Sequence, residues 1–115
     1  MTDDPRERLL AFTDMLDSSK DSILDAGCPV GSLCSELAKD TEALQSKSRE
    51  VFEIIREWMS KQFSALGYED ADERAMDFLA RMQGVSVVSC AFKDNDFLQR
   101  SLDEVRTWIN GLASK

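Results

Sequence analysis

Cysteines, serines and paired carboxylates are the residues of this sequence that could carry chemistry, but none has the neighbours that such chemistry needs. The 115 residues include Cys28, Cys34 and Cys90 and no histidine. Histidine is the commonest general base and metal ligand, and it usually activates a serine or cysteine nucleophile. The five residues between Cys28 and Cys34 are not a usual zinc-site spacing. We therefore expect no catalytic residues, no metal, no cofactor and no enzymatic activity.

Cys28 precedes Pro29 at a predicted helix N-terminus. Exposed N–H groups and the helix dipole can make a thiol reactive at such a position, which would suit redox sensing. We favour the alternative of an inert, partly buried cysteine. The carboxylate pairs Asp3–Asp4 and Asp94–Asp96 fall at predicted helix ends, where capping and the dipole explain them.

The composition indicates one acidic domain over residues 1–115. Fourteen basic and 22 acidic residues give a formal net charge of −8, and the basic residues are spread along the chain. This charge repels phosphate backbones, so we expect no DNA binding by this chain alone. No stretch approaches the about 18 to 20 apolar residues of a membrane span, and the acidic start is not a secretory signal. We expect a cytoplasmic protein without membrane contact.

Apolar periodicity predicts five helices and no strands. The predicted ranges are about 5–25, with fraying after Ser18-Ser19, then 30–39, 42–66, 71–92 and 96–113. Asp4 with Pro5 predicts the first helix start, and Gly27 and Gly67 predict helix ends. Asp70 and Glu73 resemble a capping box. Residues 85–92 are β-branched and nearly uncharged, which suits a strand, but they continue the helical phase of 75–85 and we predict a helix.

Four segments together resemble the C-terminal domain of TetR-type transcriptional regulators. Residues 27–37 read GCPVGSLCSEL, close to the family pattern G-C-hydrophobic-hydrophobic-G-N/S-L-x-x-E-L. Residues 4–12 (DPRERLLAF) resemble the first helix of that domain, and residues 80–89 (ARMQGVSVVS) resemble its Q-G-small-apolar penultimate helix. Residues 97–102 (FLQRSL), followed by Trp108-Ile109, resemble its last helix. The match spans nearly the whole chain in the family's order.

The resemblance implies an all-α, five-helix orthogonal and antiparallel bundle that binds a small, mostly apolar effector. In the family, the helices that correspond to the first four predicted here enclose the effector pocket. Methionine and aromatic side chains make an adaptable lining for such a pocket. By helical phase, the implied lining is Phe12, Met15, Leu16, Leu33, Leu37, Phe52, Ile55, Met59, Phe78 and Met82. The competing interpretation is that these side chains simply fill the core.

The resemblance also implies a homodimer in which the last two helices of each subunit form a four-helix bundle. Gly84, Ser86 and Ser89 are small residues inside a helix, and a glycine there costs about 1 kcal/mol relative to alanine, so close approach of another backbone would explain it. The implied interface is Gly84, Val87, Val88, Ala91, Leu98, Leu102, Val105 and Trp108.

The sequence departs from the family in one large respect, because no segment of it resembles the N-terminal helix-turn-helix domain. Two functions therefore remain open. The first is an effector-binding and dimerisation domain whose ligand is coupled to DNA-binding geometry through a reader outside these 115 residues. The second is a stand-alone helical interaction module without a DNA reader.

Overall fold

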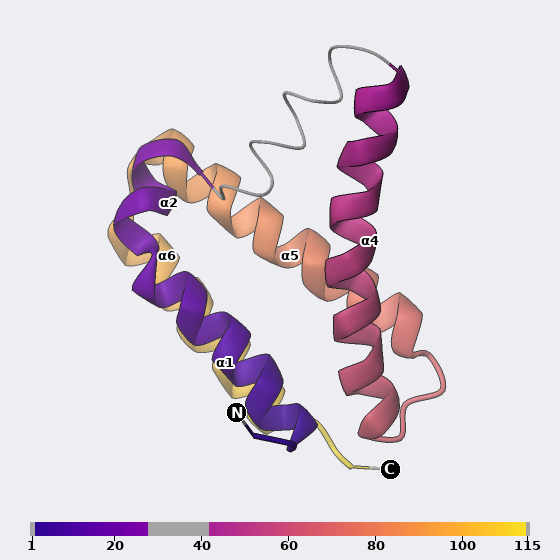
Figure 1. The fold of residues 1–115 in the computed structure, drawn as a ribbon. Coiled ribbons are helices and arrows are strands. Elements are labelled where there is room, and N and C mark those ends of the chain that lie inside the picture. Colours follow the sequence, from indigo (N-terminus) through magenta and orange to yellow (C-terminus); the bar gives the residue numbers. More distant parts are fainter. Residues whose placement is uncertain (1, 28–41, 115) are drawn as a thin grey trace.

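The computed structural model describes residues 2–27 and 42–114, and all regular structure in these ranges is helical, as predicted (Figure 1). The helices are α1 (Pro5–Ser18), α2 (Lys20–Ala26), α4 (Glu42–Ala65), α5 (Ala71–Phe92) and α6 (Asn95–Asn110). The predicted helix over 30–39 lies outside the described residues. The same holds for Cys28 and Cys34, and for two members of the predicted lining, Leu33 and Leu37.

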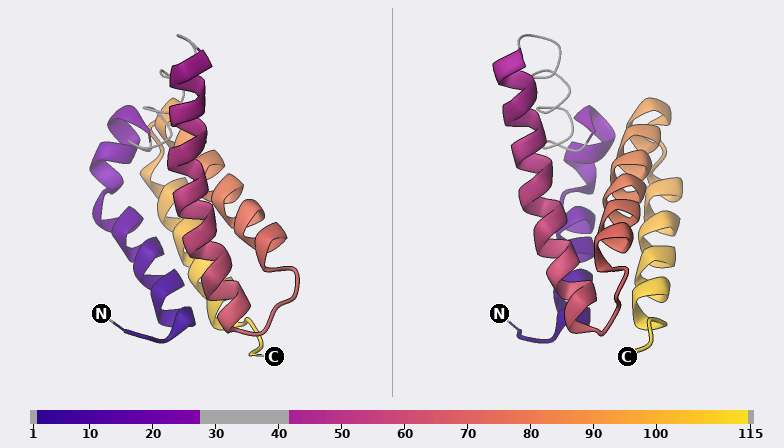
Figure 2. Two further views of the ribbon diagram at one scale, coloured as in Figure 1. Left: turned by 45° about the vertical axis from the view of Figure 1, so that its right-hand side comes forward. Right: turned by 90° about the vertical axis from the view of Figure 1, so that its right-hand side faces the viewer.

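The helices form a bundle in which α4 and α6 lie on opposite sides, with α1 and α5 between them (Figure 2). Both α1 and α5 contact α4, and both also contact α6. The first and last helices, α1 and α6, run antiparallel side by side (Figures 1 and 2). The short α2 packs on α5 near the turn between α5 and α6.

Most of the predicted helix ends are confirmed by backbone geometry. Asp4 caps α1 by accepting a hydrogen bond from the Arg6 N–H at 2.9 Å. Gly27 and Gly67 end α2 and α4 with φ of 77° and 97°, values that glycine adopts without strain. The capping-box prediction at α5 is wrong: the Asp70 side chain makes no cap hydrogen bond.

The predicted helix over 5–25 is two helices rather than one. The break falls at Ser19, whose N–H donates to the carbonyls of Met15 and Leu16 at 3.2 and 3.1 Å. Ser18 Oγ donates back to the Asp14 carbonyl at 3.0 Å, a contact that often bends helices. The change of direction lets Ile23 of α2 become fully buried, so tertiary packing turned the predicted fraying into a break.

The ambiguous segment 85–92 is the last two turns of α5, as its helical phase predicted. Ser86 and Ser89, at 2% and 0% exposure, lie on its inner face. They therefore face the core of this chain and permit close packing of α5 on its own neighbours. The turn to α6 follows at Lys93, which adopts a left-handed φ of 51°.

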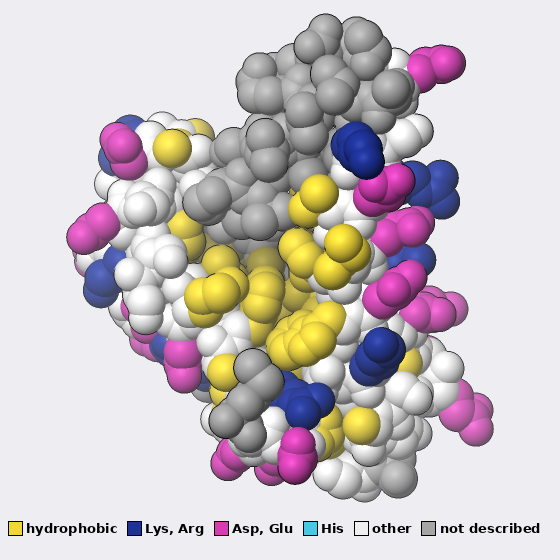
Figure 3. Space-filling model, viewed as in Figure 1, with side chains coloured by type: hydrophobic (Ala, Val, Ile, Leu, Met, Phe, Trp, Pro, Cys, Tyr) yellow, Lys and Arg dark blue, Asp and Glu magenta, His cyan; other side chains and the backbone are white. Residues whose placement is uncertain are grey.

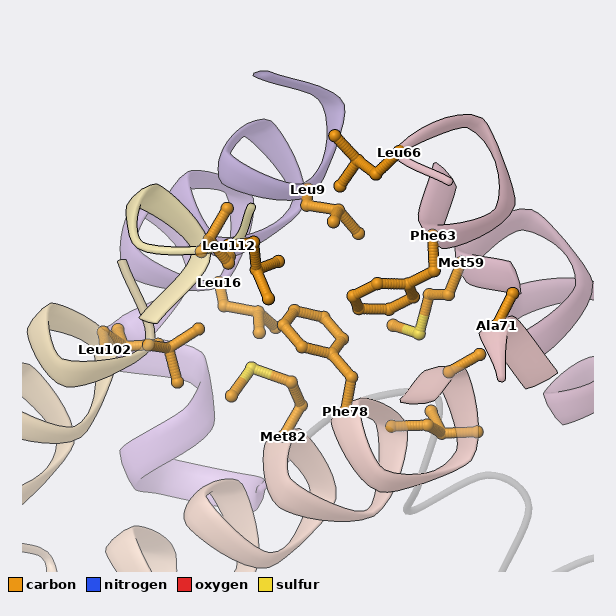
Figure 4. Close-up of a cluster of buried hydrophobic side chains, with 14 of the residues drawn as sticks. Leu9, Leu16, Met59, Phe63, Leu66, Ala71, Phe78, Met82, Leu102 and Leu112 are labelled. Carbon is orange, nitrogen blue, oxygen red and sulfur yellow. The ribbon is translucent and has the colours of Figure 1, made fainter. Parts of the chain in front are cut away.

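A single apolar core holds the described helices together. Figure 4 shows side chains from α1, α4, α5 and α6 pointing toward a common centre, with Phe63 and Phe78 side by side. The fully buried members with the largest side chains are Phe63, Phe78, Leu9, Ile23, Met59, Met82, Leu98, Leu102, Ile109 and Val105.

Candidate ligand-binding and dimerisation surfaces

A connected group of aromatic rings links α1, α4, α5 and α6. The Phe12 ring of α1 lies 6.0 Å, centroid to centroid, from both Trp58 of α4 and Phe78 of α5. Phe78 stacks on Trp108 of α6 at 5.8 Å and meets Phe63 edge-on at 6.3 Å. Because aromatic pairs at these separations attract one another beyond their area burial, this group fixes how the four helices meet.

The structure places four of the predicted lining residues deep in the core. These are Leu16, Met59, Phe78 and Met82, with exposures of 7%, 0%, 1% and 2%. Their side chains are already covered by neighbouring side chains of the same chain (Figure 4). They can form only the floor of a ligand site, because a ligand would reach them after displacing the side chains above.

Three other predicted lining residues, Phe12, Met15 and Ile55, belong to α1 and α4, which meet where the Phe12 ring contacts Trp58. Phe12 and Ile55 are half-buried and pack against the core, whereas Met15 is 54% exposed. Figure 3 shows apolar side chains gathering on the face between these two helices. Trp58, half-buried beside Phe12, belongs to the same surface and was absent from the predicted lining. Its position one turn after Ile55 was the available signal.

Phe52, the remaining predicted member, lies on a different flank of α4. It lines a groove of about 370 Å³ between α4 and α5, together with Met76 and Leu79 of α5. The structure therefore divides the predicted lining among the core, the α1–α4 surface and this α4–α5 groove.

A network of charges fixes α6 to α1. Arg106 Nη2 donates to Asp17 Oδ2 at 2.6 Å and to Asp14 Oδ1 at 2.9 Å, and Nη1 donates to Asp103 Oδ1 at 3.0 Å. The hydrogen bond from Arg106 lowers the pKa of Asp17 below its ordinary value of 3.8, although partial burial opposes this shift. The hydrogen bond to Asp17 in turn raises the pKa of Arg106. We call these four residues the Arg106 network.

Two further cationic side chains, Arg6 and Lys93, donate hydrogen bonds to backbone carbonyls near helix ends. The Arg6 guanidinium donates to the carbonyls of Ile109 and Leu112 at the end of α6. Lys93 Nζ donates to the carbonyls of Leu24 and Asp25 in α2, at 2.7 and 2.9 Å. Since the last carbonyls of a helix lack intrahelical partners, these contacts join α1 to α6 and α2 to α5.

The outer face of α5 carries half of the predicted dimer interface. Gly84, Val87, Val88 and Ala91 are exposed, with Val87 at 62% and Val88 at 42%. A Cβ added at Gly84 would meet no atom within 4 Å, so nothing in the described part of this chain requires a glycine there. An approaching partner helix remains a physical reason for it.

The other half of the predicted interface is packed inside this chain, so its part in a dimer stays a prediction. Leu98, Leu102 and Val105 of α6 are at 1%, 1% and 0% exposure inside this chain, and Trp108 stacks on Phe78. The apolar side chains of α6 pack against α1 and α5. The outward face of α6 is polar, so α6 offers a partner little apolar surface. The exposed side chains there include Arg100, Asp103, Glu104 and Thr107.

Two exposed apolar side chains of α5 were missed by the sequence analysis. Met76, at 50% exposure, lies two turns before Gly84, and Phe92, at 77%, ends the helix. Extending the i, i+4 pattern of Gly84 and Val88 in both directions would have found both. We call the exposed residues Gly84, Val87, Val88, Ala91 and Phe92 the α5 face.

The described residues include no cluster of three or more His, Cys, Asp or Glu side chains able to hold a metal ion. Within the same ranges, Cys90 is a free, half-buried thiol. No helix among the described residues is long and apolar enough to cross a membrane.

Comparison with protein families identifies the family of this chain. Residues 5–104 match the family described as "Transcriptional regulator LmrA/YxaF-like, C-terminal domain". The chain therefore belongs to the C-terminal domains of TetR-type transcriptional regulators, as its motifs indicated. Domains of this class bind effectors and mediate dimerisation of the regulator. A comparison with curated proteins found no match.

Proposed function

We propose that this chain binds a small, mostly apolar effector at the α1–α4 surface, forms a homodimer through the α5 face, and couples the two. The observation that carries the effector site is the position of Phe12, Ile55 and Trp58. Their side chains are half-buried, so each keeps surface that a ligand could cover. Met15 extends the same surface outward.

Binding at this surface would act on helix positions because it lies where α1 and α4 come together. An effector that prefers one α1–α4 spacing shifts the population toward that arrangement by its difference in affinity for the two. α4 packs directly on α5, and Phe12 of α1 meets Phe78 of α5, so the shift reaches the helix that carries the proposed dimer surface. In a full-length regulator, a change in subunit arrangement would alter the spacing of the DNA readers.

A neutral apolar dye, N-phenyl-1-naphthylamine, tests the effector site. Its fluorescence should rise saturably with the protein. Ile55→Gln should weaken binding about tenfold, since an apolar side chain of this size contributes on the order of 1.5–3 kcal/mol when fully covered. Ile54→Gln is the matched control, because Ile54 is the neighbouring residue at 69% exposure. Equal loss in both variants, or no saturable binding, would contradict the proposed site.

Light scattering after size-exclusion chromatography tests the homodimer. Gly84→Leu should shift the protein to monomer at tens of micromolar, while the fold stays intact because no described atom lies within 4 Å of the new Cβ. Thr107→Leu on the outward face of α6 is the control and should remain dimeric. A wild-type monomer that captures a different helical protein through the α5 face would favour the interaction-module alternative.

A further inference from the structure

The groove between α4 and α5 is lined by two arginines and one glutamate, so its lining has more positive than negative charge. Its wall on α4 holds Arg49, Glu53 and Arg56, and its apolar floor is Phe52, Met76 and Leu79. Arg49 Nε pairs with Glu53 Oε1 at 3.1 Å. Arg56 is half-buried and makes no hydrogen bond or ion pair with any group that the structure describes. Among the described residues, one guanidinium is therefore left without an ion pair beside an apolar floor.

We propose that this groove binds an amphipathic monocarboxylate, with the carboxylate on Arg56 and the apolar part over Phe52, Met76 and Leu79. A guanidinium presents two parallel N–H donors that match one carboxylate, and a half-buried cation gains from such a partner. The site is separate from the proposed effector surface, because Phe12, Ile55 and Trp58 do not line it.

The charges of the wall select a single negative charge rather than a phosphate ester. Arg49 is paired with Glu53, so Arg56 is the groove arginine without an ion pair among the described residues, and a second negative charge would approach the Glu53 carboxylate. The net charge of −8 does not prevent binding, because salt at physiological strength screens charges beyond about 8 Å.

The size of the groove restricts the ligand to a small molecule. Its volume of about 370 Å³ is at the lower end of the range for ligand pockets, about 300 to 1,000 Å³. Leu79 is 7% exposed and forms a closed floor, whereas Met76 is 50% exposed and can move aside or cover a bound ring. A short aryl-alkanoate meets these requirements.

Calorimetric titration with 4-phenylbutyrate tests the proposal, and 4-phenylbutyramide serves as the uncharged probe. The carboxylate should bind wild type, and Arg56→Gln should weaken it about tenfold, which is the range of a charge-assisted hydrogen bond. Glu53→Gln should strengthen binding, because the competing carboxylate is gone. The amide should bind wild type and Arg56→Gln equally.

Two controls separate this site from other parts of the molecule. Arg81→Gln removes an arginine of α5 that does not line the groove and should leave the affinity unchanged. Ile55→Gln, which tests the effector surface, should also leave it unchanged, so failure of one proposal is distinguishable from failure of the other. Equal affinity of the carboxylate for wild type and Arg56→Gln, or loss of binding in Ile55→Gln, would overturn the groove site.

Discussion

The two sides of the bundle are held by different forces. On the α6 side, the Arg106 network, Arg6 and Lys93 connect α1 with α6 and α2 with α5 through hydrogen bonds between residues distant in sequence. On the α4 side, the ion pairs of the first half of α4, Lys47–Glu50 and Arg49–Glu53, stay within the helix. That half of α4 meets its neighbours through half-buried apolar side chains such as Phe52 and Ile55.

This difference assigns the two sides different roles. Directional hydrogen bonds and ion pairs hold α6 in one register, whereas apolar contacts resist sliding and repacking less because they are not directional. Both proposed ligand surfaces lie on the α4 side, where the contacts that a ligand would replace are mainly apolar, although Ser60 Oγ of α4 also donates to Asp72 Oδ1 of α5 at 2.6 Å. We therefore expect the α6 side to be the fixed frame and α4 the helix whose position responds to ligands.

The largest expected effect contrasts two phenylalanines. Phe78→Ala should lower the free energy of unfolding by about 3 to 5 kcal/mol, because the ring is 1% exposed and its loss leaves a cavity. Phe52→Ala should cost less than about 2 kcal/mol, since that ring borders the α4–α5 groove. Urea unfolding of both variants measures the difference. Equal losses would show that α4 is packed as tightly as the centre of the core.

A smaller effect is expected from breaking the Arg106 network. Arg106→Gln should destabilise by about 1 to 2 kcal/mol, because it removes the charge-assisted hydrogen bonds to three carboxylates from a side chain only 25% exposed. Arg49→Gln on α4 is the matched control and should cost no more than about 0.5 kcal/mol, the usual worth of an exposed pair one turn apart. Similar losses in the two variants would remove the contrast between the sides.

The contribution of the Asp17–Arg106 pair to stability should fall in acid solution. The folded-state pKa of Asp17 is lowered by Arg106, so this carboxylate contributes stability above its unfolded pKa, near 3.8, and loses it as pH falls through the folded value. The stability gap between wild type and Arg106→Gln should be constant from pH 7 to 5 and should narrow below about pH 4. Asp17→Asn should abolish most of this narrowing. A gap that changed mainly near neutral pH would point to another group.

The smallest expected effect concerns DNA. Neither side of the bundle presents a basic helix, and the net charge is −8, so this chain alone should show no duplex binding at physiological salt. Gel-shift titration measures it. A salt-sensitive shift that survives non-specific competitor would overturn the prediction.

The sequence by itself determined the family and three of the described helices, α4, α5 and α6. The bounds predicted for the fourth helix, 71–92, are those of α5, and the third and fifth predicted ranges agree with α4 and α6 to within a few residues. Local signals were sufficient there because the apolar stripes are long and because Asp4, Gly27 and Gly67 mark the ends. The family motifs are also local in sequence, so they could be read without coordinates.

Only the tertiary structure decided which apolar surface is buried within the chain and which stays exposed. Helical phase shows that Leu102 and Val88 each lie on an apolar stripe, but not that α1 and α5 cover the first and leave the second 42% exposed. The break at Ser19, the Arg106 network and the lack of an ion pair at Arg56 within the described residues likewise depend on how elements meet in space. Burial and pairing arise between elements distant in sequence, so periodicity within one helix cannot specify them.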